Sequence, residues 1–106
     1  MRIDAHAHVW IADGRRQATS LDRLLDACDR LEIDEAWVSC PVTHGMGSPE
    51  EVRERNDAVL DAMRRHPTRF RGYCFVVAGY YREALAEIDR CLDQGMIGIK
   101  LYHQYF

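Results

Sequence analysis

Residues 3–8 of the chain read IDAHAH, a short run in which apolar and polar side chains alternate. Strict alternation predicts a β-strand, because successive side chains of a strand point to opposite faces. The apolar side chains would then pack under helices, while Asp4, His6 and His8 would share the other face. Two imidazoles at this spacing can bind one metal ion, and Asp4 could support them from deeper on the same face.

Short apolar runs and helical stripes alternate along the rest of the chain. Residues 35–40, 70–77 and 97–102 predict three further strands, since they are short and rich in β-branched and aromatic residues. Between the strands, apolar residues recur at the spacing of one helix face. The three predicted faces are Leu21, Leu24, Leu25, Cys28 and Leu31; Val52, Val59, Leu60 and Met63; and Tyr81, Leu85, Ile88 and Leu92.

Helix-end signals flank these stripes. Thr19 and Ser20 offer hydroxyl caps for the first helix, and Ser48 precedes Pro49 at the start of the second. Gly95 follows the third helix as a C-terminal cap. The order β-α-β-α-β-α-β predicts one α/β domain over residues 1–106, with a parallel sheet and right-handed crossovers.

Composition excludes several classes of protein. The chain has 106 residues, of which 47% are hydrophobic and 29% charged, an ordinary balance for one globular domain. A net charge of −3 without a basic stripe argues against a nucleic-acid partner. No run reaches the roughly 20 apolar residues of a membrane span, and Asp4 interrupts any signal peptide. The four cysteines lack C-x-x-C spacing, which favours buried reduced thiols and the cytoplasm.

The loops that follow the strands are the expected place for function, because in parallel sheets ligands bind at the carboxyl ends of the strands. His44 lies on the second of these loops, where it is placed either to reach a substrate or simply to face solvent. Trp10 and Tyr80 are candidates to line a pocket. Cys40 is not expected to be a nucleophile, because the sequence places no base beside it. His66 follows a helix and belongs to the opposite end.

The fourth predicted strand carries a lysine in an apolar setting, Gly98-Ile99-Lys100-Leu101. Alternation predicts that Ile99 and Leu101 pack beneath helices and that Lys100 points to the other side of the sheet. An unpaired ammonium is costly there, so Lys100 needs a carboxylate partner, a substrate anion or a modification that removes its charge. A structural salt bridge is the alternative.

With IDAHAH at its start and GIKL on its fourth strand, the chain resembles the amidohydrolase superfamily. It is most similar to the amidohydrolase-related branch, which holds hydrolases and decarboxylases like aminocarboxymuconate-semialdehyde decarboxylase. The resemblance covers essentially all residues and implies the first half of a (β/α)8 TIM barrel. It implies a divalent metal, expected to be Zn²⁺, with His6 and His8 as its first-strand ligands. Lys100 lies on the strand where several members carry a carboxylated lysine, and Tyr102 stands where related sequences often have histidine.

The resemblance also implies a reaction and a longer enzyme. Metal-activated water would attack a carbonyl-containing small molecule, and Lys100 and His44 are the candidate catalytic residues. Decarboxylation on the same metal site is the alternative reaction. The family's further ligands come from later strands, so we expect residues 1–106 to be the N-terminal half of a hydrolase and inactive alone.

Two interpretations of another class stay open. A truncated, non-catalytic half-barrel would associate through its open sheet edges, as a homo-oligomer or with the missing C-terminal half. In a small open α/β sandwich, His6 and His8 would be incidental. No glycine-rich phosphate loop follows the first strand, so nucleotide binding is not expected.

Overall fold

In a computed structural model that describes residues 1–12, 15–16 and 18–103, parallel strands and helices alternate along the chain. The strands β1, β4, β5 and β6 form one parallel sheet in that order, and β2 and β3 form a small antiparallel pair. The elements are β1 (Ile3–His8), β2 (Ile11–Ala12), β3 (Arg15–Arg16), α1 (Ala18–Arg30), β4 (Glu35–Ser39), α2 (Pro49–Arg65), β5 (Phe70–Phe75), α3 (Tyr81–Asp93) and β6 (Gly98–Lys100).

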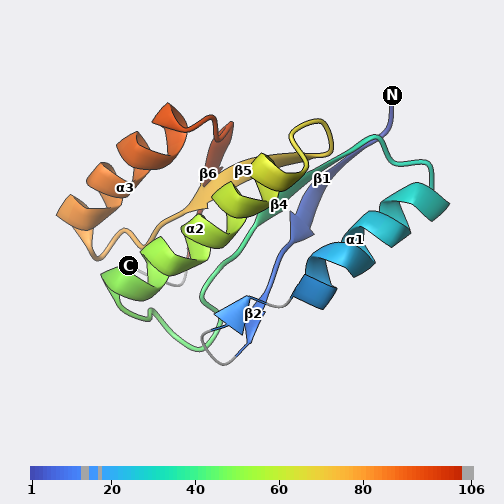
Figure 1. The fold of residues 1–106 in the computed structure, drawn as a ribbon. Helices are drawn as coiled ribbons and strands as arrows, with labels where there is room; N and C mark the ends of the chain where they lie inside the picture. Colours follow the sequence, from blue (N-terminus) through green and yellow to red (C-terminus); the bar gives the residue numbers. More distant parts are fainter. Residues whose placement is uncertain (13–14, 17, 104–106) are drawn as a thin grey trace.

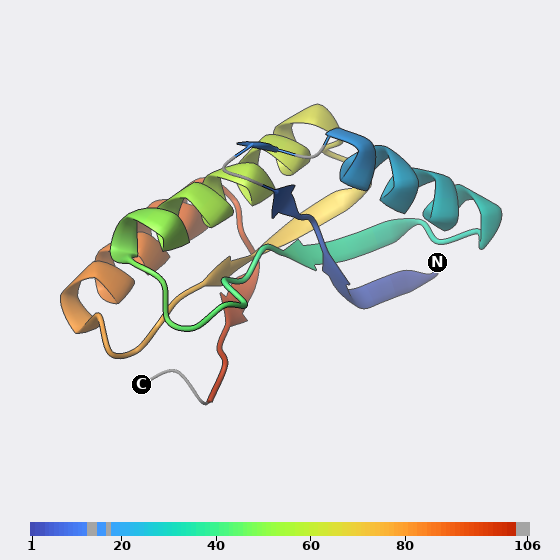
Figure 2. The same cartoon turned by 90° about the horizontal axis from the view of Figure 1, so that it is seen from below.

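The three described helices all cover the same face of the sheet (Figure 1; Figure 2). Crossovers of one hand between neighbouring parallel strands place every helix on that side. The main core lies between the layers, where Val38 and Cys74 from the sheet pack with Val59 and Leu60 of α2. None of the described helices covers the other face of the sheet (Figure 2), and we call it the open face.

Helix α2 begins and ends as its sequence predicts. Ser48 is the N-cap, with its hydroxyl accepting the backbone N–H of Glu51 at 3.1 Å, and Pro49 is the first helical residue. This arrangement satisfies one of the N–H groups that a helix start leaves without a partner. After α3, Gly95 has a φ of +101°, a left-handed conformation that favours glycine. The predicted Ser48 cap and Gly95 terminator are therefore confirmed.

Gly72 lets α2 sit closely on β5. A Cβ at Gly72 would lie 2.6 Å from both Met63 Sδ and Val59 Cγ1. We expect Gly72→Ala to lower the free energy of unfolding by about 1–3 kcal/mol, because the added methyl overpacks the interface. Urea denaturation measures the change. Gly98→Ala is the control, since its methyl would meet only the Tyr73 ring, at 3.1 Å. Equal losses in the two variants would contradict the special closeness at Gly72.

The structure corrects the predicted limits of the first helix. Helix α1 begins at Ala18, so Thr19 and Ser20 lie inside its first turn and are not its caps. It ends at Arg30, which leaves Leu31 beyond the helix and 64% exposed. The β2–β3 pair has no counterpart among the predicted elements, because two-residue strands are too short to show a periodicity.

The predicted buried face of α3 is wrong in part: Ile88 packs against the main core, but the other three residues are exposed. Tyr81 and Leu85 are 69% and 49% exposed, and the buried side chains of the helix are Glu87 and Cys91. The helix is rotated so that Glu87 reaches polar partners in the interior, which the apolar pattern could not reveal. Ile99 and Leu101 are also exposed, because no described helix covers the outer face of β6.

The cysteine prediction holds: Cys28, Cys40, Cys74 and Cys91 are all free thiols and all buried. Across the described residues, none of the helices combines the length and the apolar content that crossing a bilayer requires.

Candidate metal and carboxylate site

Strand β1 carries an irregularity that divides its polar residues between the two faces of the sheet. In its register with β4, Asp4 pairs with Ala36 and His8 pairs with Ser39, with a shift between Asp4 and Ala7. Because register partners share a face and side chains alternate, Asp4 lies on the helix-covered face and His8 on the open face. An extra residue of this kind is how a bulge changes which side chains point inward.

The carboxylate of Asp4 stabilises this irregularity. Its Oδ1 accepts the backbone N–H of His6 at 3.0 Å. Burial raises the pKa of the Cys28 thiol on α1, and the negative charge of Asp4 adds to that rise, which agrees with its place on the helix side. The prediction that Asp4 shares a face with both imidazoles is therefore wrong, and Asp4 supports the backbone of His6 instead of its ring.

His6 and His8 lie together, with ring centroids 5.0 Å apart and ring planes at 81°. Nε2 of His8 is buried and is the one buried side-chain nitrogen or oxygen in the described residues without a hydrogen-bond partner. Burial lowers the pKa of His8, and the charges of His6 and Lys100 lower it further. A neutral imidazole with an unpartnered nitrogen is the form that binds a metal ion.

Lys100 reaches the same place from the opposite edge of the sheet. Its Nζ lies 3.2 Å from Nε2 of His6 and 5.2 Å from the centroid of the Tyr102 ring. Lys100 pairs in register with Phe75, on the open face, as alternation predicts. None of the described carboxylates forms an ion pair with it. The ammonium is therefore available to an anion.

A hollow of about 200 Å³ lies between these side chains, lined by Ala5, His6, Ser39, Tyr73, Ile99 and Lys100. The hydroxyl of Tyr73 donates to the carbonyl of Ala5 at 3.1 Å, which joins β5 to β1 across the open face. The exposed ring of Trp10 lies 5.0 Å from that of His8. The hollow thus lies between one imidazole, that of His6, the ring of Tyr73 and the ammonium of Lys100, which none of the described carboxylates pairs.

Tyr73 was not among the predicted site residues, although the sequence contains a signal for it. Side chains alternate along β5, so Arg71, Tyr73 and Phe75 had to share a face. That face could be assigned to the open side only once Gly72 was known to meet α2.

The structure does not bring His44 to this hollow. His44 lies on the exposed loop before α2, where its Nε2 is 3.1 Å from Oε2 of Glu51. Among the described residues, no contact joins it to His6, His8 or Lys100. Its catalytic role stays a prediction.

The remaining candidates also lie elsewhere. Tyr80 donates its hydroxyl to the carbonyl of Gly47 and lines a separate cavity of about 250 Å³ between α2 and α3. Cys40 is buried, and this burial raises the pKa of its thiol, which agrees with an inert side chain. His66 caps the C-terminal end of α2.

Within the described ranges, no third histidine, cysteine or carboxylate joins His6 and His8 to make a cluster of metal-binding size. A catalytic zinc site commonly has three protein ligands and an open position. The described residues therefore contain two potential ligands and an adjacent cation, which is part of a centre.

Comparison with known proteins identifies the family and the fold of the chain. The family model described as amidohydrolase matches residues 3–105. The 2,6-dihydroxybenzoate decarboxylase from Rhizobium aligns with a TM-score of 0.74 and 16% identity, over 92% of this chain and 37% of that one. The 5-carboxyvanillate decarboxylase from Novosphingobium aromaticivorans, complexed with manganese, aligns with a TM-score of 0.76 and 18% identity, over 95% of this chain and 41% of that one. No curated protein matches.

These similarities confirm the predicted fold class. Four parallel strands alternating with helices match the N-terminal part of a TIM-barrel neighbour. The chain spans 37% and 41% of the two decarboxylases just described. At such low sequence identity, the structural match shows the fold alone.

Proposed function

The chain belongs to the amidohydrolase family, and from this premise we propose that it forms the metal-binding N-terminal part of an enzyme acting on a small carbonyl or carboxyl compound. The observation that carries the proposal is the unpartnered, buried Nε2 of His8 beside His6, with the ammonium of Lys100, which contacts His6 and is paired by no described carboxylate, next to them. In this proposal the imidazoles hold a cation and Lys100 meets the anionic part of the substrate.

His6 and His8 fit a divalent metal ion. A buried imidazole nitrogen without a partner is costly unless something binds it, and imidazole is a common ligand of divalent metals. When bound, the metal supplies Lewis acidity and makes hydroxide available near neutral pH. The family resemblance implies Zn²⁺, whereas the Novosphingobium neighbour is complexed with manganese, so we propose a divalent ion of either kind.

The chain's own residues bind and orient the substrate. Lys100 carries a positive charge that no described carboxylate neutralises, and ammonium groups bind carboxylates through charge-assisted hydrogen bonds. Trp10 and Tyr102 flank the imidazoles and Lys100, and their rings offer flat apolar surface to a planar substrate. His44 stays a candidate acid or base, with Glu51 placed to orient its imidazole.

Two reactions suit this arrangement. In the first, a hydrolase uses metal-activated water on a carbonyl group. In the second, a decarboxylase uses Lys100 to place a carboxylate beside the metal ligands. Lys100, which no described carboxylate pairs, suits the second reaction, and the Rhizobium and Novosphingobium neighbours are decarboxylases of aromatic acids.

The remaining metal ligands must come from outside the described residues. We propose that a C-terminal half supplies them, either as further sequence or as a second molecule, including another copy of this chain. We also propose the cytoplasm as the compartment, since four free buried thiols suit a reducing environment.

The test of this proposal is ligand binding by the Mn²⁺-loaded chain, measured by calorimetry with 2,6-dihydroxybenzoate. We expect Lys100→Met to weaken binding by about 10–100-fold, the effect of losing a hydrogen bond to a charged group. Lys100→Arg keeps the charge and should retain most of the affinity. Equal binding by wild type and Lys100→Met would rule out the proposed role of Lys100.

A further inference from the structure

Outside the proposed site, the buried side-chain amide of Asn56 makes hydrogen bonds to β5 that a neighbouring strand would otherwise make. Asn56 of α2 is fully buried, and its side chain pairs with both backbone polar groups of Phe75. Its Nδ2 donates to the Phe75 carbonyl at 2.9 Å, and its Oδ1 accepts the Phe75 N–H at 2.9 Å. The β4–β5 ladder ends at Gly72, so Phe75 lies beyond the reach of β4. Asn56 therefore completes the hydrogen bonding of β5 where the sheet narrows.

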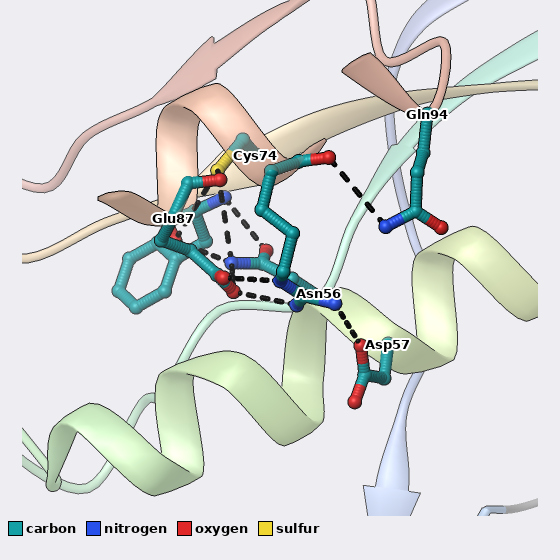
Figure 3. Close-up of polar contacts among 7 residues, drawn as sticks. Asn56, Asp57, Cys74, Glu87 and Gln94 are labelled. Carbon is teal, nitrogen blue, oxygen red and sulfur yellow. Dashed lines mark hydrogen bonds and ion pairs between the residues drawn. The ribbon is translucent and has the colours of Figure 1, made fainter. Parts of the chain in front are cut away.

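An ion-pair network from α3 fixes this amide (Figure 3). Oε2 of Glu87 accepts a second hydrogen bond from Asn56 Nδ2, at 2.9 Å. Arg90 binds both oxygens of Glu87, at 2.6 and 2.9 Å, and also Oδ1 of Asp57 at 2.7 Å. Burial would raise the pKa of Glu87, but hydrogen bonds from Arg90 and Asn56 outweigh it and lower that pKa. Glu87 thus stays a carboxylate and holds the donor side of the amide toward itself and Phe75.

The strand that Asn56 holds, β5, pairs directly with β6, the strand that carries Lys100. Phe75 pairs in register with Lys100, and the N–H of Val76 donates to the Lys100 carbonyl at 3.3 Å. The Phe75 ring lies 5.6 Å from that of Tyr102, the ring beneath the Lys100 ammonium. This last paired segment of β5 therefore sets where β6 directs Lys100.

We propose that Asn56 is a positioning residue: by holding Phe75, it fixes the end of β5 so that β6 presents Lys100 beside His6. Glu87 and Arg90 serve this role by locking the orientation of the amide. The inference rests on the proposed function, in which Lys100 meets the carboxylate of the substrate. If Asn56 had only a structural role, replacing it would lower the stability of the chain but would not change ligand binding through Lys100.

The first test follows the backbone and needs no ligand. In the 106-residue chain, Asn56→Leu keeps the side-chain size and removes both hydrogen bonds to Phe75. Hydrogen exchange by NMR should accelerate at the amides of Phe75 and Val76 by about 100-fold, relative to the amide of Val38. Contacts between the Phe75 and Tyr102 rings should weaken as well. Leu60→Ala, a cavity variant on the same helix, is the control and should not show this local pattern.

The second test separates positioning from stability. In the Mn²⁺-loaded chain, Asn56→Leu should weaken binding of 2,6-dihydroxybenzoate by about tenfold and change Mn²⁺ affinity by less than about twofold, because the proposed metal ligands lie on β1. In a Lys100→Met background, Asn56→Leu should have no further effect on ligand affinity. If Asn56→Leu does not fold, Glu87→Gln, which weakens the lock on the amide, is measured in the same ways and should show smaller changes of the same kind.

The outcomes distinguish this inference from the proposed function. A Phe75 amide that stays protected in Asn56→Leu, or an equal loss of affinity in the Lys100→Met background, would overturn the positioning role. Failure of the wild-type chain to bind 2,6-dihydroxybenzoate would count against the proposed function, and the exchange experiment would then decide the role of Asn56 at the backbone.

Discussion

His6→Ala and His8→Ala are each expected to weaken Mn²⁺ binding by about 100-fold or more, because even residues that only support metal ligands commonly contribute 10–100-fold. Each variant removes one of the two imidazoles that lie 5.0 Å apart on the open face. Binding can be followed by the electron paramagnetic resonance signal of free Mn²⁺, and Zn²⁺ by competition. A chelator that removes the metal should leave the wild-type chain without bound Mn²⁺, as we expect for these variants.

The control for this prediction is another histidine. His66 caps α2, outside the proposed site, and His66→Ala should leave Mn²⁺ affinity unchanged within about twofold. His44→Ala should behave in the same way if that residue acts on the substrate. Wild-type metal affinity in both His6→Ala and His8→Ala would refute the metal assignment and leave the fold intact.

Phe75→Ala is expected to lower the free energy of unfolding by about 3–5 kcal/mol, the cost of removing a large aromatic side chain from a packed interior. Phe75 is fully buried and packs in a small cluster with Val42, Val52 and Val77. Domains have a total stability of about 5–15 kcal/mol, so this single change should remove a large share of it. Thermal and urea unfolding, followed by circular dichroism, measure the loss.

Leu85→Ala is the matched comparison, because it removes an apolar side chain from α3 that is 49% exposed. Its effect should be within about 0.5 kcal/mol. Similar losses for Phe75→Ala and Leu85→Ala would mean that α3 buries the face predicted from its apolar stripe, contrary to the structure.

The sequence predicted strands and helix ends well where a single local pattern was enough to identify them. Alternation along residues 3–8 identified β1, and the Ser48-Pro49 pair located the start of α2 within the chain. The same two-residue period placed His6, His8 and Lys100 toward one side of the sheet, where the structure finds them. These features depend on local geometry, which neighbouring residues determine.

Features that depend on distant partners could not be predicted. Asp4 was assigned to the wrong face because a register shift becomes visible only when β1 is paired with β4. On α3, Tyr81 and Leu85 give the stronger apolar pattern, yet Glu87 is buried because Asn56 and Arg90 satisfy its carboxylate. Hydrophobic periodicity treats every buried position as apolar, so it misses a helix face that is buried through paired charges.

The register shift in β1 has a consequence for protein engineering. Grafting only the two histidines onto a regular strand of another scaffold would omit the register shift and the Asp4 carboxylate that stabilises it. A transplanted motif should therefore begin at Asp4, since the hydrogen bond from the His6 backbone to this residue is internal to the segment. Moved as one six-residue unit, the segment would bring to its new host both imidazoles of the open face together with the carboxylate of the helix-covered face that stabilises the shift.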